Sequence, residues 1–318
     1  MAWGFHTSGC GSPTPSKFMQ DYSGAIVKVN EDGTANLIVA LADPGTGNQQ
    51  VLAQIVAEEL GIKYEDVTVP DSNTDVAPYN CMQHGSRSTY VVGGVVKAAA
   101  AEAKKTLLKW AARMLEASVD DLEVKDQKVC VKGSPQKAVT VAEVATYADS
   151  KTQQLGTIMG CYSGRALACP PHFAAYFIEV GVDMETGEIR VANAVGGADV
   201  GVVISPDGAE AQIGGGLHMG LGYALTEKFL IDKATGKVLN PFPVDYKILT
   251  AADMPDLEIF FADTVEPTGP FGAKGLGEAA INPVAAAVAN AIYNATGGRI
   301  KELPITPEKI LAALKKER

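Results

Sequence analysis

Two segments of the chain repeat one pattern, a β-hairpin followed by a helix, and this repetition constrains the fold more than any other feature. Residues 24–41 alternate apolar and polar side chains about a turn at residues 30–33, and an apolar period of 3.6 residues then ends at Gly61. Residues 172–199 repeat the strand, turn and strand, and a helix is predicted over residues 206–229. The pattern predicts an α+β fold of duplicated hairpin-plus-helix modules, divided as residues 1–150 and 151–318.

The segment between the two hairpin-plus-helix units is predicted to be mostly helical. Residues 88–115 are rich in Ala with spaced Lys, which is typical of a long helix, and the pair Gly93-Gly94 indicates close backbone packing. Thr140 and Glu143 match a capping box that opens a short helix. Other patterns predict strands at 66–69 and 257–262, hairpins at 122–131 and about Thr235-Gly236, a helix with Asn282 as N-cap and Pro283 after it, and a terminal helix at 306–316.

Composition and charge exclude several classes of function. The 318 residues are 47% hydrophobic and 20% charged, which is ordinary for a globular protein. The formal net charge is −10, so the chain lacks the basic footprint that a nucleic acid or an anionic membrane would require. No apolar stretch is long enough to predict a transmembrane helix.

The cysteines and the first residues indicate a cytoplasmic protein. There are five cysteines, an odd number, with no C-x-x-C pair, so free thiols in a reducing compartment are predicted. The first residues lack the basic and continuous apolar regions of a secretory signal. The four histidines are scattered, and none pairs with a Cys or a carboxylate at metal-ligand spacing, so no protein-ligated metal is predicted.

The strongest local signal is the loop GAKGLGE at residues 272–278. It matches neither of the glycine-rich phosphate-binding patterns, so its glycines indicate only a backbone that folds tightly. Its last residue, Glu278, lies just ahead of a predicted helix and is a reasonable candidate for a general base. From the spacing alone, a tight surface turn remains an equal alternative.

Three further segments could contact a ligand or could serve packing alone. The stretch IGGGLHMGLGYAL at residues 213–225 has too many glycines for propensity to stabilise a helix, so either another helix or a ligand approaches its backbone. The segment HGSRST at residues 84–89 is predicted to cap the long helix, with phosphate binding as the alternative. The loop DPGTG at residues 43–47 has the same two interpretations.

Taken together, these segments resemble the molybdopterin-binding subunit of the xanthine dehydrogenase and aldehyde oxidase family. The segments AQIGGGLHMGLGYALTEKFL, LNPFPVDYKILTAADMP, EPTGPFGAKGLGEAAINPVAAAVANAIYNATG and LPITPEKIL occur in family order and at family spacing. The earlier DPGTGNQQVLAQIVAEELGI and HGSRSTYVVGGVV are also similar to family segments that face the cofactor. The resemblance covers nearly the whole chain and leaves out the N-terminal half of the family's subunit.

The resemblance implies a role for particular residues. It makes Glu278 the general base that deprotonates a hydroxide on molybdenum, after which the oxygen attacks an electrophilic carbon and hydride passes to the metal centre. It makes the following residues cofactor contacts: Gly45, Thr46, Gly47, Ser86, Arg87, Ser88, Thr89, Gln212, Met219, Gly272, Ala273, Lys274, Gly275 and Gly277. The sequence departs from the family at Thr46 and Met219, where many relatives have Gln, and each change removes an amide that could bond the pterin.

The implied function is that of one subunit in a molybdenum hydroxylase, an oxidoreductase active only with its partners. The cofactor would be molybdenum-molybdopterin in its cytosine dinucleotide form, and FAD and [2Fe-2S] clusters would lie on partner subunits. Further partners would be the chain that supplies the N-terminal half and a small substrate, with an N-heterocycle such as a purine, xanthine or nicotinate preferred. The alternatives are an aldehyde oxidoreductase, an aromatic acyl-CoA reductase such as hydroxybenzoyl-CoA reductase, and a structural or assembly subunit without turnover.

Overall fold

The computed structural model describes residues 1–11, 21–151 and 156–316, and they form two compact units. Unit 1 comprises Met1–His6, Pro171–Thr264 and Leu276–Arg318, and unit 2 comprises Thr7–Pro170 and Val265–Gly275. These units do not coincide with the segments 1–150 and 151–318, because residues after 150 form a strand in the sheet of unit 2 and residues 1–6 belong to unit 1. The division at residue 150 stays a prediction.

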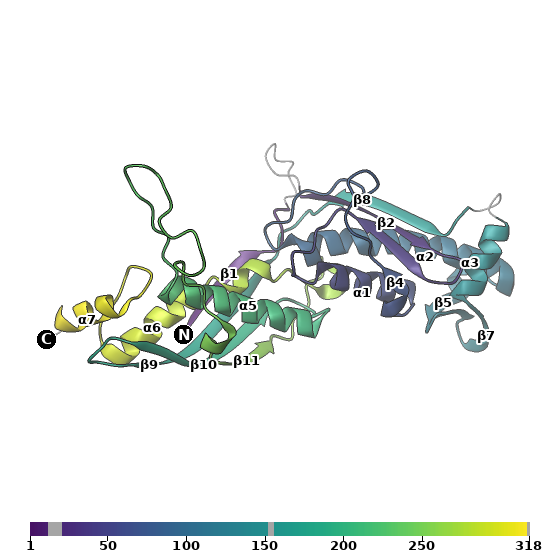
Figure 1. The fold of residues 1–318 in the computed structure, drawn as a ribbon. Helices are drawn as coiled ribbons and strands as arrows, with labels where there is room; N and C mark the ends of the chain where they lie inside the picture. Colours follow the sequence, from purple (N-terminus) through teal and green to yellow (C-terminus); the bar gives the residue numbers. More distant parts are fainter. Residues whose placement is uncertain (12–20, 152–155, 317–318) are drawn as a thin grey trace. The chain divides into compact units, whose positions relative to one another are not determined.

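Unit 2 is built on a four-stranded sheet with two long helices (Figure 1). The strand order is β4-β3-β2-β8, where β2 is Tyr22–Val29, β3 is Ala35–Val39, β4 is Val67–Thr68 and β8 is Met159–Arg165. Helix α1 (Asn48–Leu60) ends at Gly61 in the left-handed region, as predicted, and α2 (Gly93–Leu115) is preceded by a π-helical turn, Ser88–Val92. Wholly buried Val27, Leu37, Ile55 and Trp110 mark the core of the unit.

A smaller sheet and a helix complete unit 2. Strands β5 (Leu122–Lys125), β6 (Lys128–Val131) and β7 (Ser134–Thr140) form this sheet, in which the sequence predicted only the β5–β6 hairpin. Helix α3 (Val141–Ser150) begins with the predicted capping box: Glu143 N–H donates to Thr140 Oγ1 at 3.1 Å, and Thr140 N–H donates to Glu143 Oε2 at 2.7 Å. The capping box is therefore confirmed.

Unit 1 is built on a second four-stranded sheet, with helices against one face (Figure 1). The order is β1-β9-β10-β11, where β1 is Ala2–Thr7, β9 is Pro171–Val182, β10 is Ile189–Asp199 and β11 is Asp256–Phe261. The helices are α5 (Pro206–Leu225), α6 (Val284–Thr296) and α7 (Pro307–Lys316). Its core includes wholly buried Tyr176, Ile213, Leu217 and Val288, so the sheet, α5 and α6 share one apolar interior.

The two sheets share a topology, which bears on the predicted repetition. In each, an antiparallel hairpin is followed by a helix, and the next strand pairs in parallel with the second hairpin strand. Strand β4 pairs with β3 after α1, and β11 pairs with β10 after α5. The α+β fold class is confirmed, and the order of elements within each unit is the one that the repeated sequence pattern predicts.

Several local predictions were wrong in detail. Helix α5 ends at Leu225, four residues before the predicted Phe229, and the hairpin about Thr235-Gly236 has only one bridge, between Ile231 and Val238. Asn282 does not cap α6, since its side-chain amide donates instead to Phe5 O at 3.2 Å. Strands β1, β7 and β8 were not predicted. Among the described residues, none of the helices is long and apolar enough to cross a membrane.

Candidate functional site

Glu278 lies in unit 1, in a 3-10 turn (Gly277–Ala280) that leads into α6. Its side chain is 48% exposed, and its Oε2 lies 3.7 Å from Nδ1 of His6 on β1. The ring of His6 in turn lies 5.9 Å, centroid to centroid, from the ring of wholly buried His172 on β9. Sequence reasoning identified Glu278 but missed His6, because the two residues meet only after β1 pairs with β9 and the turn of Glu278 packs against β9 and α5.

Helix α5 holds the turn that carries Glu278. A Cβ added to Gly216 would lie 2.5 Å from Ala280 Cβ and 2.7 Å from its carbonyl carbon, and one added to Gly220 would lie 2.4 Å from Val284 Cβ. The hydroxyl of Tyr176 also donates to Ile213 O at 3.0 Å, which fixes α5 to the sheet. Of the two explanations for the glycines, close packing of protein backbone is therefore the right one at Gly216 and Gly220.

This packing predicts a large difference between two neighbouring glycines. We expect Gly216→Ala to lower the free energy of unfolding by about 1–3 kcal/mol, because backbone atoms of Ala280 would have to shift. Gly215→Ala is the matched control: no atom lies within 4 Å of its added Cβ, so we expect unchanged stability or a gain of up to about 1 kcal/mol from helix propensity. Urea unfolding followed by circular dichroism checks both, and equal effects would contradict the packing argument.

A different face of α5 is open. Gln212, Gly215, Met219 and Tyr223 follow one another at helical spacing, and Met219 and Tyr223 are 53% and 59% exposed. The space next to Gly215 is unfilled, which leaves helix backbone accessible between an amide and a thioether. The two α5 residues that the sequence predicted as cofactor contacts, Gln212 and Met219, therefore share one accessible face.

Unit 2 brings two of the predicted cofactor segments together. A Cβ added to Gly275 would lie 2.0 Å from Ser86 O, so the loop 272–275 and the segment 86–89 touch through their backbones. Gly275 N–H also donates to Ser8 Oγ at 2.9 Å. Gly272 and Ser86 have positive φ values of 87° and 51°, and Ala273 is buried. Lys274 is half-buried in the same loop. Gly277 follows in unit 1 with Glu278.

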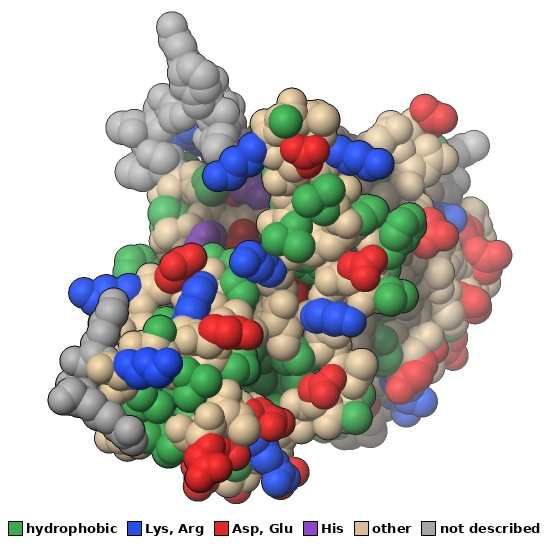
Figure 2. All heavy atoms as spheres, turned by 60° about the vertical axis from the view of Figure 1, so that its left-hand side comes forward, with side chains coloured by type: hydrophobic (Ala, Val, Ile, Leu, Met, Phe, Trp, Pro, Cys, Tyr) green, Lys and Arg blue, Asp and Glu red, His purple; other side chains and the backbone are tan. Residues whose placement is uncertain are grey.

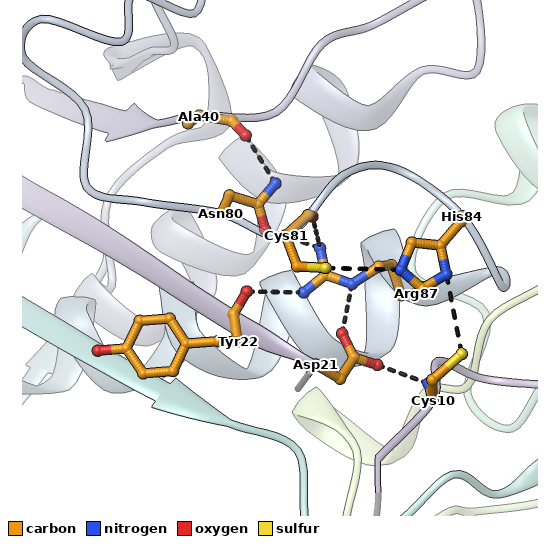
Figure 3. Close-up of polar contacts among 8 residues, drawn as sticks. All are labelled: Cys10, Asp21, Tyr22, Ala40, Asn80, Cys81, His84 and Arg87. Atoms are coloured by element: carbon orange, nitrogen blue, oxygen red, sulfur yellow. Dashed lines mark hydrogen bonds and ion pairs between the residues drawn. The ribbon is translucent and has the colours of Figure 1, made fainter. Parts of the chain in front are cut away.

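The structure gives Arg87 a role inside unit 2 (Figure 3). Its side chain is wholly buried, and its Nε pairs with Asp21 Oδ1 at 2.5 Å. Its Nη1 donates to Asn80 Oδ1 and to Cys81 O, and its Nη2 donates to Tyr22 O. These buried partners engage the guanidinium, which argues against the alternative that it holds a phosphate, and the implied contact of Arg87 with a cofactor stays a prediction.

The start of the long helix also differs from the sequence expectation. Ser88 and Thr89 lie half-buried in the first turn of the π-helical segment, whose N-cap is Arg87, and the Arg87 side chain makes no capping hydrogen bond there. Capping by the neighbouring hydroxyl groups stays a prediction. The pair Gly93-Gly94 was predicted to mark close backbone packing. This prediction holds for Gly93, whose added Cβ would lie 2.8 Å from Ile55, but not for Gly94, which faces open space.

The loop at residues 43–47 is organised around Asp43. Its carboxylate accepts the backbone N–H groups of Gly45 and Gly47 at 3.0 Å each and that of Gln49 at 3.2 Å. Thr46 Oγ1 also donates to it, at 3.4 Å. These donors face Asp43, so contacts from Gly45, Thr46 or Gly47 to a ligand would come from the outer side of the loop, beside a hollow of about 590 Å³ that Asp71 and Ser72 also line.

These hydrogen bonds make the contribution of Asp43 to the stability of the fold depend on pH. Burial raises the pKa of Asp43, but the hydrogen bonds from Gln49, Gly45 and Gly47 together outweigh it, so the pKa lies below its ordinary value of 3.8. The carboxylate therefore stabilises the fold above pH 3.8, and this contribution disappears as the pH falls through the lowered pKa.

We expect Asp43→Ala to lower the free energy of unfolding at pH 7 by about 1–2 kcal/mol, as removal of a helix cap does, and the difference from wild type to vanish at strongly acidic pH. Urea unfolding followed by fluorescence of buried Trp110 measures this. Asp71→Ala is the control, because Asp71 is exposed beside the same hollow, and it should leave stability unchanged. A pH-independent loss for Asp43→Ala would contradict the charge argument.

Sequence reasoning also missed a Cys-His cluster in unit 2. Cys10 Sγ lies 3.8 Å from Nδ1 of His84, and Cys81 Sγ lies 3.7 Å from its Nε2. Nothing in the spacing of Cys10 indicated this contact. Within the part of the chain that the structure describes, no group of three or more His, Cys, Asp or Glu side chains is placed so that it could hold a metal ion. Acidic and basic side chains are interspersed on the face that Figure 2 shows.

Comparisons with known proteins match this fold and these segments. A family model for the molybdopterin cofactor-binding domain matches residues 1–255. The xanthine dehydrogenase molybdenum-binding subunit of Escherichia coli O157:H7 is 34% identical over 292 residues, covering 91% of this chain and 39% of that protein. The nicotine 6-hydroxylase large subunit of Paenarthrobacter nicotinovorans is 33% identical over 299 residues, covering 92% and 36%.

A solved structure agrees with the sequence comparisons. A crystal structure of Cu,Mo-CO dehydrogenase matches with a TM-score of 0.90 and 28% identity, covering 99% of this chain and 40% of that chain. The chain therefore belongs to the molybdopterin-binding subunits of the xanthine dehydrogenase family. It spans about two fifths of the length of the relatives that it matches.

Proposed function

We propose that the chain holds part of a molybdenum-molybdopterin cofactor and supplies Glu278 as the general base of a molybdenum hydroxylase. Family membership supports the cofactor. The observation that carries the proposal is the placement of Glu278: its half-exposed carboxylate lies beside His6 on a turn that α5 fixes through Gly216. A fixed and accessible carboxylate has the geometry that a general base requires.

The residues present fit such a cofactor. The accessible face of α5 at Gln212, Gly215 and Met219 leaves room for a planar ligand against helix backbone. In unit 2, the backbone of residues 86–89 and of residues 272–275 would contact other parts of the cofactor. Ser88 and Thr89 add hydroxyl groups that can form hydrogen bonds with it. Arg87 would act on the cofactor only through the shape of its loop, because its side chain is buried.

The bound cofactor supplies the two-electron redox chemistry, and the protein supplies positioning and proton transfer. Glu278 accepts, at a carboxylate oxygen, the proton that water loses before its oxygen adds to the substrate carbon. His6 Nδ1, at 3.7 Å from Oε2, orients that carboxylate. Gly277 begins the 3-10 turn immediately before Glu278 and is itself a proposed cofactor contact.

The proposed substrate is an N-heterocycle of the purine, xanthine or nicotinate type. The names of two relatives, a xanthine dehydrogenase subunit and a nicotine 6-hydroxylase subunit, support this class. The proposed partners are a chain that supplies the rest of the molybdopterin subunit, an iron-sulfur subunit and an FAD subunit, all in the cytoplasm. The cytosine dinucleotide form of the cofactor belongs to the same proposal.

Coexpression of the gene for this chain with the genes that flank it tests the proposed function. We expect molybdenum to copurify with the assembly and the assembly to oxidise N-heterocycles with an artificial electron acceptor. An assembly with stoichiometric molybdenum that oxidises only aldehydes would overturn the substrate class. Absence of molybdenum from a stable, correctly assembled complex would overturn the cofactor role.

A further inference from the structure

Two cysteines from separate segments of unit 2 flank one imidazole. Nε2 of His84 faces Cys81 Sγ at 3.7 Å, and Nδ1 faces Cys10 Sγ at 3.8 Å (Figure 3). All three side chains are half-buried. These are hydrogen-bonding distances for sulfur, so the imidazole can exchange a proton with one thiol while its other nitrogen bonds to the second.

One buried ion pair holds both cysteines in place. Asp21 Oδ2 accepts the backbone N–H of Cys10 at 2.6 Å, and Asp21 Oδ1 binds Arg87. Arg87 Nη1 donates to the carbonyl oxygen of Cys81 at 2.8 Å. The Cys81 N–H donates to Tyr22 O at 2.9 Å. Because these bonds fix the backbone at both thiols, the contacts with His84 are part of a built arrangement.

The geometry argues against a single metal ion at this place. Each sulfur faces a different nitrogen of the ring, and the two nitrogens of an imidazole point away from each other. An ion bound to one nitrogen would therefore reach only one sulfur and would have two protein ligands, where structural zinc takes four. Proton exchange between thiol and imidazole fits the arrangement better.

We propose that Cys81 is a reactive nucleophilic thiol, that His84 is its base, and that the site takes low-molecular-weight disulfides. Cys10 is the positioning residue: its sulfur faces Nδ1 of His84 and favours the tautomer that carries its proton on Nδ1, in which Nε2 can accept the proton of Cys81. The Cys81 sulfur then attacks one sulfur of the disulfide and forms a mixed disulfide. The disulfide bond breaks, and the departing thiolate takes the proton from His84, so the exchange needs no other oxidant.

The place of Cys81 gives this modification a consequence. Its carbonyl oxygen is a partner of Arg87, the residue that follows Ser86, and the backbone of Ser86 lies against Gly275. A group added to Cys81 therefore lies on a loop tied to the proposed cofactor contacts. The proposal itself concerns the thiol chemistry and holds whether or not the cofactor is bound.

Exchange with glutathione disulfide in the full chain, followed by peptide mass spectrometry, tests the proposal. The exposed cysteine Cys161 is the internal control. We expect Cys81 to react at least about tenfold faster than Cys161, because reactivity follows the thiolate and not exposure alone. A Cys81 rate equal to or below that of Cys161, or preferential reaction of Cys10, would overturn the proposal without any variant.

Two variants distinguish the role of His84 as the base from the role of Cys10 as the residue that positions its ring. His84→Asn is expected to bring the Cys81 rate down to that of Cys161 or below, with the Cys161 rate unchanged. A circular dichroism spectrum and urea unfolding midpoint like those of the wild type show that the variant is folded. Cys10→Ala should slow Cys81 less, because it removes only the partner of Nδ1. An unchanged Cys81 rate in folded His84→Asn would show that His84 is not the base.

Discussion

Glu278→Gln is expected to reduce kcat of the assembled, molybdenum-loaded enzyme by about 10²–10⁴-fold, the range that a positioned general base contributes. Glutamine has nearly the size of glutamate but cannot accept the proton. The half-exposed position of the side chain and its contact with His6 mean that the substitution buries no uncompensated group. We therefore expect the stability of the chain and its molybdenum content to be unchanged, and only turnover to fall.

Glu258→Gln is the matched control for this substitution. Glu258 is an exposed residue of β11, in the same unit, and it should leave turnover at the wild-type level. Steady-state kinetics with an N-heterocycle and metal analysis of the same preparations give both readouts. Unchanged turnover in Glu278→Gln would show that Glu278 is not the general base. Loss of molybdenum from this variant would show that Glu278 helps to bind the cofactor.

The local order of elements was predictable because it depends on neighbouring residues. The hairpin β2–β3, helix α1 with its stop at Gly61, and the capping box at Thr140 all follow from side chains within a few residues of one another. The position of Glu278 at the start of a turn before α6 was predictable for the same reason. Local hydrogen bonds and hydrophobic periodicity carry such information in the sequence.

The missed features all depend on contacts between distant parts of the chain. Strand β1 lies beside β9, so His6 meets Glu278 only once the sheet of unit 1 has formed. The three-residue step from Cys81 to His84 was visible, but the placement of Cys10 at the other nitrogen was not. Strand β8 completes a sheet that began more than a hundred residues earlier, and no local pattern marked it.

Arg87 shows why the type of a residue can mislead. An arginine among Ser and Thr residues ahead of a helix favours phosphate binding, because its fork matches phosphate oxygens. Here the guanidinium instead donates hydrogen bonds to the Asp21 carboxylate and to three other oxygen atoms in the interior of unit 2. The burial of the guanidinium decides between these roles, and burial depends on the tertiary fold.

Arg87→Met is therefore expected to lower the free energy of unfolding of unit 2 by about 3–5 kcal/mol, because it leaves the Asp21 carboxylate buried without its partner. Urea unfolding followed by the fluorescence of Trp110 measures the loss, since Trp110 is buried in unit 2 while Trp3 is exposed. Arg190→Met, at an exposed position on β10, is the control and should leave stability within about 0.5 kcal/mol of wild type.

The double variant Asp21→Asn, Arg87→Met decides how the pair acts. Because it removes the charge that Arg87→Met alone would leave unpaired, its loss should be smaller than the sum of the two single losses, by at least about 2 kcal/mol. Additive losses would mean that the two residues stabilise the fold separately. If Arg87→Met instead left stability unchanged and only lowered molybdenum content, Arg87 would be a cofactor ligand after all, and the loop at residues 86–89 would open on binding to release it.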